Sequence, residues 1–94
     1  MTLKIGDWWF SSAEYDAEND VLYLSIDEPR PGHGEETPEG HILRFDEEGV
    51  FCGVTLLDVK ASLDKGAIDV TLPRKFFPRR ECVTGGDLRR MLIC

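Results

Sequence analysis

The sequence predicts a mainly β fold of the α+β class: an antiparallel sheet of five or six strands, built from two hairpins, with a short C-terminal helix. Three observations support this prediction. Residues 21–26 are rich in β-branched and aromatic side chains, and their leucines and isoleucine alternate onto one face. Residues 67–72 alternate in the same way. The acidic segments 16–20 and 46–49 separate extended runs and are rich in residues that favour tight turns.

The first hairpin is expected to pair residues 8–15 with residues 21–26 around the turn at 16–20. Aspartate and asparagine in that turn favour it because their side chains hydrogen-bond to nearby backbone groups. The next segment, 27–40, holds three prolines and four glutamates. This composition predicts a loop between the two hairpins.

The second hairpin is expected to have its arms at 42–45 and 50–57, joined by a turn at 46–49 in which Gly49 can adopt a positive φ. A three-residue loop would place Phe45 opposite Phe51 and Arg44 opposite Cys52. The aromatic cross-strand pair would then stabilise the register by a few tenths to about 1 kcal/mol.

The rest of the chain predicts shorter elements. We expect a short helical or irregular connection at 58–65, a fifth strand at 67–72 and a last short strand at 81–83. Thr84 and Asp87 have the spacing of a helix capping box. The apolar residues that follow recur at helix spacing, which predicts the C-terminal helix.

One stretch of the chain resembles a known family. The phrase YDAENDVLYL at 15–24 is followed by an acidic loop, a strand at 42–46, a turn at 47–49 and the segment GVTLLD at 53–58. In this order and spacing, residues 12–61 resemble the domain-of-unknown-function 2283 family. The resemblance implies a small antiparallel β domain, found mostly in bacteria and archaea, with no established biochemical activity. Its members often look like partners of small toxin-like proteins, which implies an antitoxin-like or other binding role.

The length of 94 residues predicts one domain over 1–94, with the family-like double hairpin at 12–61 and a basic C-terminal extension at 66–94. Eighteen acidic and eleven basic residues give a net charge of −7, which excludes a uniformly basic nucleic-acid coat. We expect neither a signal peptide nor a membrane span. Three cysteines without CxxC spacing are typical of reduced thiols, so a cytoplasmic location is expected.

Three acidic residues of the first turn have the spacing of calcium ligands. Asp16, Glu18 and Asp20 stand at alternate positions, as the first ligands of a calcium loop do. However, Val21 stands where that loop needs glycine, and Asp27 stands where it needs glutamate. Turn chemistry explains these residues better, so calcium is not expected.

No other pattern indicates catalysis, a cofactor or a metal. His33 and His41 have no partner at ligand spacing. Cys52 is interpreted as a small hydrophobic residue of a strand, in preference to a thiol activated by Arg44. No nucleophile has a recognisable base near it in the sequence, and the glycines do not form a phosphate-binding pattern. We therefore expect no catalytic residues, cofactor or metal site.

The two parts of the chain differ in charge. Residues 1–58 hold fourteen acidic and three basic residues, a net charge of −11, whereas residues 59–94 hold four acidic and eight basic residues, a net charge of +4. Four of the basic residues of the second part flank Phe76 and Phe77. Either the phenylalanines fill the core and the arginines are solvated, or this segment docks on the acidic part of a second copy, or it binds nucleic acid. The candidate interaction residues are Trp8, Arg74, Lys75, Phe76, Phe77, Arg79 and Arg80.

The adjacent Trp8 and Trp9 favour self-association. Neighbours on a strand point to opposite faces, so burial of both rings needs a cover on both faces, and a homodimer is the simplest cover. The function expected is that of a cytosolic protein-interaction module, homodimeric and antitoxin-like toward a small toxin. The first alternative is a nucleic-acid-binding regulator that uses the basic C-terminal segment. The second is an enzyme with a site at a dimer interface.

Overall fold

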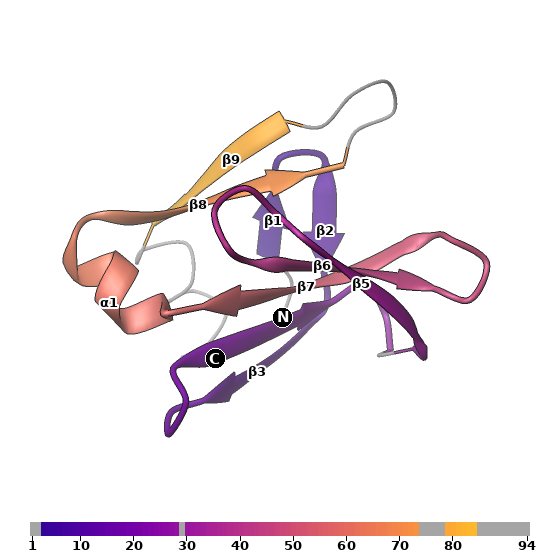
Figure 1. Cartoon of the computed structure of the whole chain (residues 1–94), viewed down its shortest axis with the longest axis horizontal. Helices are drawn as coiled ribbons and strands as arrows, with labels where there is room; N and C mark the ends of the chain where they lie inside the picture. The colour runs from indigo at the N-terminus through magenta and orange to yellow at the C-terminus, as the bar shows by residue number, and fades with distance from the viewer. Residues whose placement is uncertain (1–2, 29, 74–78, 85–94) are drawn as a thin grey trace.

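The computed structural model describes residues 3–28, 30–73 and 79–84 (Figure 1). Nine strands and one helix lie within these residues. They are β1 (Leu3–Ile5), β2 (Trp8–Phe10), β3 (Ser12–Asp16), β4 (Val21–Ser25), β5 (Gly32–Glu36), β6 (Ile42–Asp46), β7 (Phe51–Leu57), α1 (Val59–Asp64), β8 (Ala67–Leu72) and β9 (Arg79–Thr84).

The strands form three antiparallel sheets. The largest has five strands in the order β3-β4-β7-β6-β5, and β1-β2 and β8-β9 are two-stranded ribbons. The predicted class, mainly β with antiparallel pairing, is confirmed. A five-stranded sheet is present as predicted, but it contains β5 and excludes the strand expected at 67–72, and the nine strands of the described residues divide among three sheets, which was not predicted. The predicted C-terminal helix lies outside the described residues.

The hydrophobic core lies between one face of the five-stranded sheet and the two ribbons. Leu22 and Leu24 of β4 pair with Leu56 and Val54 of β7, and all four side chains are 0 % exposed. Because alternate residues of a strand share a face, these four define the inner face of the sheet. The ribbons contribute Leu3, Ile5, Phe10, Ile68, Val70, Leu72 and Val83 to the cluster, which also includes Phe51 of β7 and Val59 of α1. The opposite face of the sheet is called the outer face below.

Residues 8–15, expected as one strand, belong to two strands. β3 pairs with β4, with Ser12 opposite Ser25 and Asp16 opposite Val21, which confirms the later part of the predicted hairpin. Residues 8–10 instead form β2, which pairs with β1 around a tight turn where Gly6 has a φ of +60°. Glycine adopts this conformation without the steric cost that a Cβ imposes. This hairpin was not predicted from the sequence.

The segment expected as a loop, 27–40, contains β5. This strand pairs with β6, with His33 opposite Phe45 and Gly34 opposite Arg44, so the loop prediction is wrong for residues 32–36. Glycine and glutamate have low strand propensity, which is why composition gave no sign of the strand. At Gly32 a Cβ would collide with the Phe45 carbonyl oxygen, so the missing side chain is what lets the two backbones pair.

The second hairpin contains a β-bulge. Phe45 lies opposite Phe51, as predicted, with ring centroids 5.8 Å apart in an edge-to-face arrangement. The predicted pairing of Arg44 with Cys52 is wrong: the register shifts after Arg44, which lies opposite Gly53. The extra residue in β7 changes the alternation, so Phe51 reaches the core although it precedes the buried Val54 by three positions.

The remaining helix and strand predictions within the described residues hold. The helix α1 lies inside the expected connection at 58–65, β8 has the expected bounds, and β9 contains residues 81–83. Cys52 is buried, 2 % exposed, which agrees with its interpretation as a small hydrophobic residue. Among the residues that the structure describes, no helix has the length and apolar character needed to cross a membrane.

Candidate binding surface on the outer sheet face

The aspartates of the acidic turn between β3 and β4 accept hydrogen bonds from neighbouring residues. The two carboxylate oxygens of Asp16 accept the backbone N–H and the side-chain amide of Asn19, and these bonds lower the pKa of Asp16. The Tyr15 hydroxyl donates to Asp20 at 2.7 Å. In the described part of the chain, no group of three or more His, Cys, Asp or Glu side chains is placed to hold a metal. The bonds between Asp16 and Asn19 confirm the turn chemistry predicted for this segment.

A row of five residues crosses the outer face and combines an apolar centre with acidic ends. The strand registers place Glu14, Tyr23, Thr55, Ile42 and Glu36 opposite one another in this order, from β3 to β5. We call them the tyrosine row. Tyr23 and Ile42 are 37 % and 36 % exposed, and Thr55 between them is buried. Glu14 and Glu36 are exposed at the two ends.

The next row along the strands has one long side chain among small ones. Ser12, Ser25, Gly53, Arg44 and Gly34 lie opposite one another in this order. We call them the arginine row. Position 53 requires glycine because the backbone of β4 lies close to it: a Cβ there would be 2.6 Å from the Leu24 carbonyl oxygen. Small neighbours on both sides leave the Arg44 side chain between two hollows of the outer face.

These hollows have different linings. One of about 330 Å³ is bordered by Ser12, Glu14, Tyr23, Ser25 and Arg44. The other, of about 470 Å³, is bordered by Arg44 and Ile42 on β6, by residues of β5, and by Arg30 and Pro31 before it. We call the second the arginine hollow, because Arg30 and Arg44 both border it.

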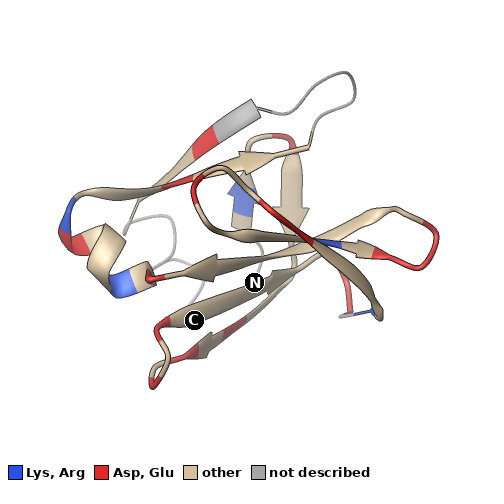
Figure 2. Ribbon diagram, in the orientation of Figure 1, with Lys and Arg blue, Asp and Glu red and all other residues tan. Residues whose placement is uncertain are grey.

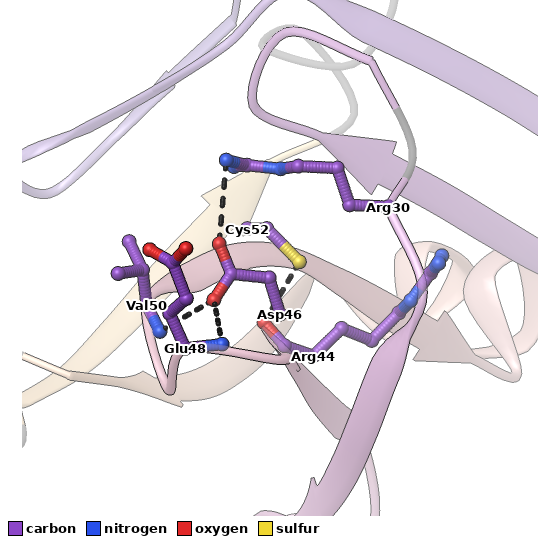
Figure 3. A network of polar contacts seen from close by, with 6 residues as sticks. All are labelled: Arg30, Arg44, Asp46, Glu48, Val50 and Cys52. Atoms are coloured by element: carbon purple, nitrogen blue, oxygen red, sulfur yellow. Dashed lines mark hydrogen bonds and ion pairs between the residues drawn. The ribbon is translucent and has the colours of Figure 1, made fainter.

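Asp46 holds Arg30 beside the arginine hollow. One carboxylate oxygen of Asp46 accepts the backbone N–H groups of Glu48 and Val50, each at 2.9 Å, which closes the β6–β7 turn. The other oxygen lies 3.4 Å from Nη1 of Arg30 (Figure 3). Figure 3 also shows the Arg44 side chain extending away from Asp46. Asp46 therefore orients Arg30, whereas the side chain of Arg44 does not contact the Asp46 carboxylate.

The structure places only some of the predicted interaction residues. Trp8 makes intramolecular contacts: its ring lies 4.8 Å from that of Phe51, and its Nε1 donates to the Pro73 carbonyl at 2.6 Å. Its neighbour Trp9 is 58 % exposed, with Nζ of Lys4 5.5 Å from the ring centroid. Arg79 and Arg80 begin β9, opposite Leu72 and Thr71 in the strand register. Arg74, Lys75, Phe76 and Phe77 lie outside the described residues.

The exposed residues of the outer face were not predicted from the sequence. Tyr23 could have been found, because it stands between Leu22 and Leu24 and must point to the opposite side of the strand. Arg30 and Arg44 carried a signal too, as two of the three basic residues in the acidic part of the chain. That both residues border one hollow could not be found, because the hollow depends on β5, which was predicted as a loop.

The comparison with protein families identifies this region. The model of the family described as "Protein of unknown function (DUF2283)" matches residues 13–60, about half of the chain. The chain belongs to the DUF2283 family. The DUF2283 match covers nearly the whole five-stranded sheet and both rows of the outer face, except Ser12. No curated protein and no solved structure matches the chain.

Proposed function

We propose that this DUF2283 protein is a protein-interaction module that binds a basic protein through the tyrosine row. One observation carries the proposal: Tyr23 and Ile42 are the exposed apolar centre of a row that ends in Glu14 and Glu36. An apolar centre inside a polar rim is the usual anatomy of a protein interface. Tyrosine is also among the residues that contribute most to binding energy in such interfaces.

The charge around this row supports a basic partner. Residues 1–58, which contain the whole tyrosine row, have a net charge of −11. Figure 2 shows Asp and Glu concentrated in the turns that border the five-stranded sheet. A negative field attracts a positively charged partner and speeds association in a salt-dependent way. The family resemblance implies a small toxin-like partner, and a basic protein of that class would fit this surface.

The homodimer expected from the sequence is part of the same proposal. Both outer strands of the five-stranded sheet, β3 and β5, have a neighbour on one side only among the described strands. Such edge strands can pair with the same strand of a second copy. Light scattering tests this: a mass of twice 10.6 kDa supports the dimer, and a monomer mass at micromolar concentration would overturn it.

The interaction is tested by capture from the native cell extract, followed by calorimetry with the purified partner. Replacement of Tyr23 and Ile42 by serine is expected to weaken binding at least about tenfold. The control is Val50→Ser, which changes another exposed apolar side chain, 51 % exposed, at the end of the β6–β7 hairpin. A captured protein that is acidic, or one that the double variant holds as tightly as wild type, would overturn the proposal.

A further inference from the structure

Strand β5 lies at an edge of the five-stranded sheet. Among the described strands it has β6 on one side and none on the other, and all five of its residues are exposed. Its sequence, GHGEE, consists of residues with low strand propensity, so pairing is what holds it extended. A strand of this kind gains stability from a second neighbour.

The hydrogen-bond pattern shows which residues of β5 face the open edge. The Thr37 N–H donates to the His41 carbonyl at 2.7 Å, so Thr37 points its backbone groups toward the chain of β6. In an antiparallel ladder, hydrogen-bonded and non-hydrogen-bonded pairs alternate. In the observed register, Glu36, Gly34 and Gly32 therefore belong to non-hydrogen-bonded pairs. Their N–H and C=O groups point away from β6, toward the open edge.

The other end of the ladder gives the same result. Asp46 lies opposite Gly32 and donates its N–H to the Val50 carbonyl at 2.9 Å, on the side of β7. The Asp46 N–H therefore does not point toward Gly32, so this pair is non-hydrogen-bonded, as the alternation requires. The open edge thus presents backbone donors and acceptors at every second residue of β5.

We propose that β5 of a second copy pairs with this edge in the antiparallel direction, with Gly34 on the two-fold axis. In this register Gly34 lies opposite Gly34 of the second copy, and Gly32 lies opposite Glu36 of the second copy. Each outward N–H then meets an outward C=O, because these pairs are the hydrogen-bonded ones across the new edge. The proposal rests on the homodimer of the proposed function and identifies its interface.

The side chains of this register are complementary. His33 lies opposite Glu35 of the second copy, in a non-hydrogen-bonded pair, where facing side chains are closest. The two-fold axis repeats this pair. An imidazole N–H donates to a carboxylate whether the ring is neutral or charged. His33 stacks on Phe45, with ring centroids 5.4 Å apart, which holds the imidazole on the face of β5 that Glu35 shares.

The other edge strand, β3, is less suited to pair with itself. Antiparallel pairing over its full length, Ser12–Asp16, places Glu14 opposite Glu14 of the second copy. Like charges directly opposite each other destabilise a sheet. The β5 register places no two like charges opposite each other. The charge pattern therefore selects β5 as the edge that joins two copies.

The dimer dissociation constant of the full chain, measured by sedimentation equilibrium, tests this interface. His33→Glu places carboxylates opposite each other twice in the dimer and should raise the dissociation constant about tenfold or more. An exchange variant, His33→Glu with Glu35→His, has the composition of the wild type and restores both pairs, so its dissociation constant should return to within about threefold of wild type. The control Lys65→Gln lowers the charge of each chain by one, at the end of α1, and should have less than about a twofold effect.

Disulfide trapping tests the register directly. In chains with Cys82 and Cys94 replaced by serine, one protein carries His33→Cys and another carries Glu35→Cys. Opposite residues of a non-hydrogen-bonded pair have Cα atoms about 4.5 Å apart, a separation that a disulfide can span. The mixture of the two proteins should therefore cross-link faster under mild oxidation than either protein alone.

The outcomes separate this interface from the homodimer itself. A monomer mass for the wild-type chain would overturn both. A dimer whose affinity is unchanged in His33→Glu, or is not restored by the exchange variant, would overturn the interface and leave the homodimer standing. The same conclusion would follow if the mixed chains cross-link no faster than either protein alone.

Discussion

The carboxylate of Asp20 accepts the backbone N–H of Lys60, forty positions later in the chain, at 2.8 and 3.0 Å from its two oxygens. This bond caps α1 from outside the helix, because the N-cap residue Asp58 is left-handed and makes no capping bond with its own side chain. The Tyr15 hydroxyl holds the same carboxylate and contributes most to the lowered pKa of Asp20. The acidic turn of the family-like phrase therefore fixes the start of the helix.

Removal of this cap should destabilise the fold. Asp20 has a φ of 55°, so Asp20→Gly keeps the backbone conformation and removes the side-chain cap together with the acceptor of the Tyr15 hydroxyl. We expect the midpoint of thermal unfolding to fall by about 4–8 °C, the shift typical of a missing cap in a domain of this size. Asp20→Asn, which tolerates this φ and keeps an acceptor, should have a smaller effect. Circular dichroism measures both, and an unchanged midpoint in Asp20→Gly would contradict the prediction.

The sequence was informative where local chemistry decides structure. The Asp16 turn follows from side-chain bonds over three positions, and the Phe45–Phe51 pair follows from the length of one hairpin loop. Strand β5 was missed because it exists through pairing with β6, although its own residues disfavour a strand. The bulge at Cys52 was missed because one-residue insertions leave no mark on composition. The candidate surface depends on both features, so it could not be predicted in full.

Gly53 should tolerate substitution less than Gly34 does, although both lie in the arginine row. A Cβ at Gly53 would meet the backbone carbonyl of Leu24 at 2.6 Å, and a paired strand cannot move away easily. We expect Gly53→Ala to lower the free energy of unfolding by about 1–3 kcal/mol. At Gly34 the obstacle is a side-chain methyl of the exposed Ile42, so Gly34→Ala should cost less than about 1 kcal/mol.

Urea unfolding of the two glycine variants gives this comparison, provided that both keep the wild-type slope. A larger decrease in stability in Gly34→Ala than in Gly53→Ala would contradict the assigned backbone contact.

A bond between Glu39 and Thr71 joins the β5–β6 turn to the β8–β9 ribbon. The Glu39 carboxylate accepts the backbone N–H and the hydroxyl of Thr71, each at 2.8 Å. Burial alone would raise the pKa of Glu39, but the hydrogen bonds to its carboxylate lower the pKa by a larger amount. The pKa of Glu39 therefore lies below its ordinary value of 4.5. The contribution of Glu39 is therefore intact at pH 7 and is lost as the pH falls below about 4.5.

Substitution of either partner should show that the two residues act together. Glu39→Gln and Thr71→Val should each lower the free energy of unfolding by about 1–2 kcal/mol. The double variant should be destabilised by less than the sum of the two single effects, because the second change removes a bond already broken. Additive effects in urea unfolding would show that the two side chains stabilise the fold independently.

The nucleic-acid alternative makes a separate prediction for the basic C-terminal segment. If residues of this segment bind phosphates, affinity for a single-stranded oligonucleotide should fall steeply with salt, because counterions are released on binding. Replacement of Arg79 and Arg80 by alanine should weaken binding and reduce the slope by about 0.7 for each phosphate that the variant no longer neutralises. Fluorescence anisotropy over a range of salt concentrations measures both quantities. Absent or salt-independent binding would remove this alternative.

His41 should make the stability of the fold depend on pH near neutrality. Its side chain is 5 % exposed, and Nδ1 accepts the backbone N–H of Leu57 at 3.1 Å, which requires the neutral ring. Burial lowers the pKa of His41 below 6.5, although a hydrogen bond with the Asp69 backbone and the charges of Glu39 and Asp58 oppose this shift. Below pH 6.5, His41 therefore binds a proton more readily in the unfolded chain than in the folded chain.

Stability should consequently fall as the pH decreases from about 6.5 toward 5, by at most about 1.4 kcal/mol per pH unit. Carboxylates with lowered pKa, such as that of Glu39, contribute at lower pH, so this window isolates the histidine. His41→Asn places an uncharged acceptor near the Nδ1 position and should remove the dependence. His33→Asn, at an exposed residue stacked on Phe45, should keep it. A pH dependence that survives in His41→Asn, measured by urea unfolding, would assign the proton to another group.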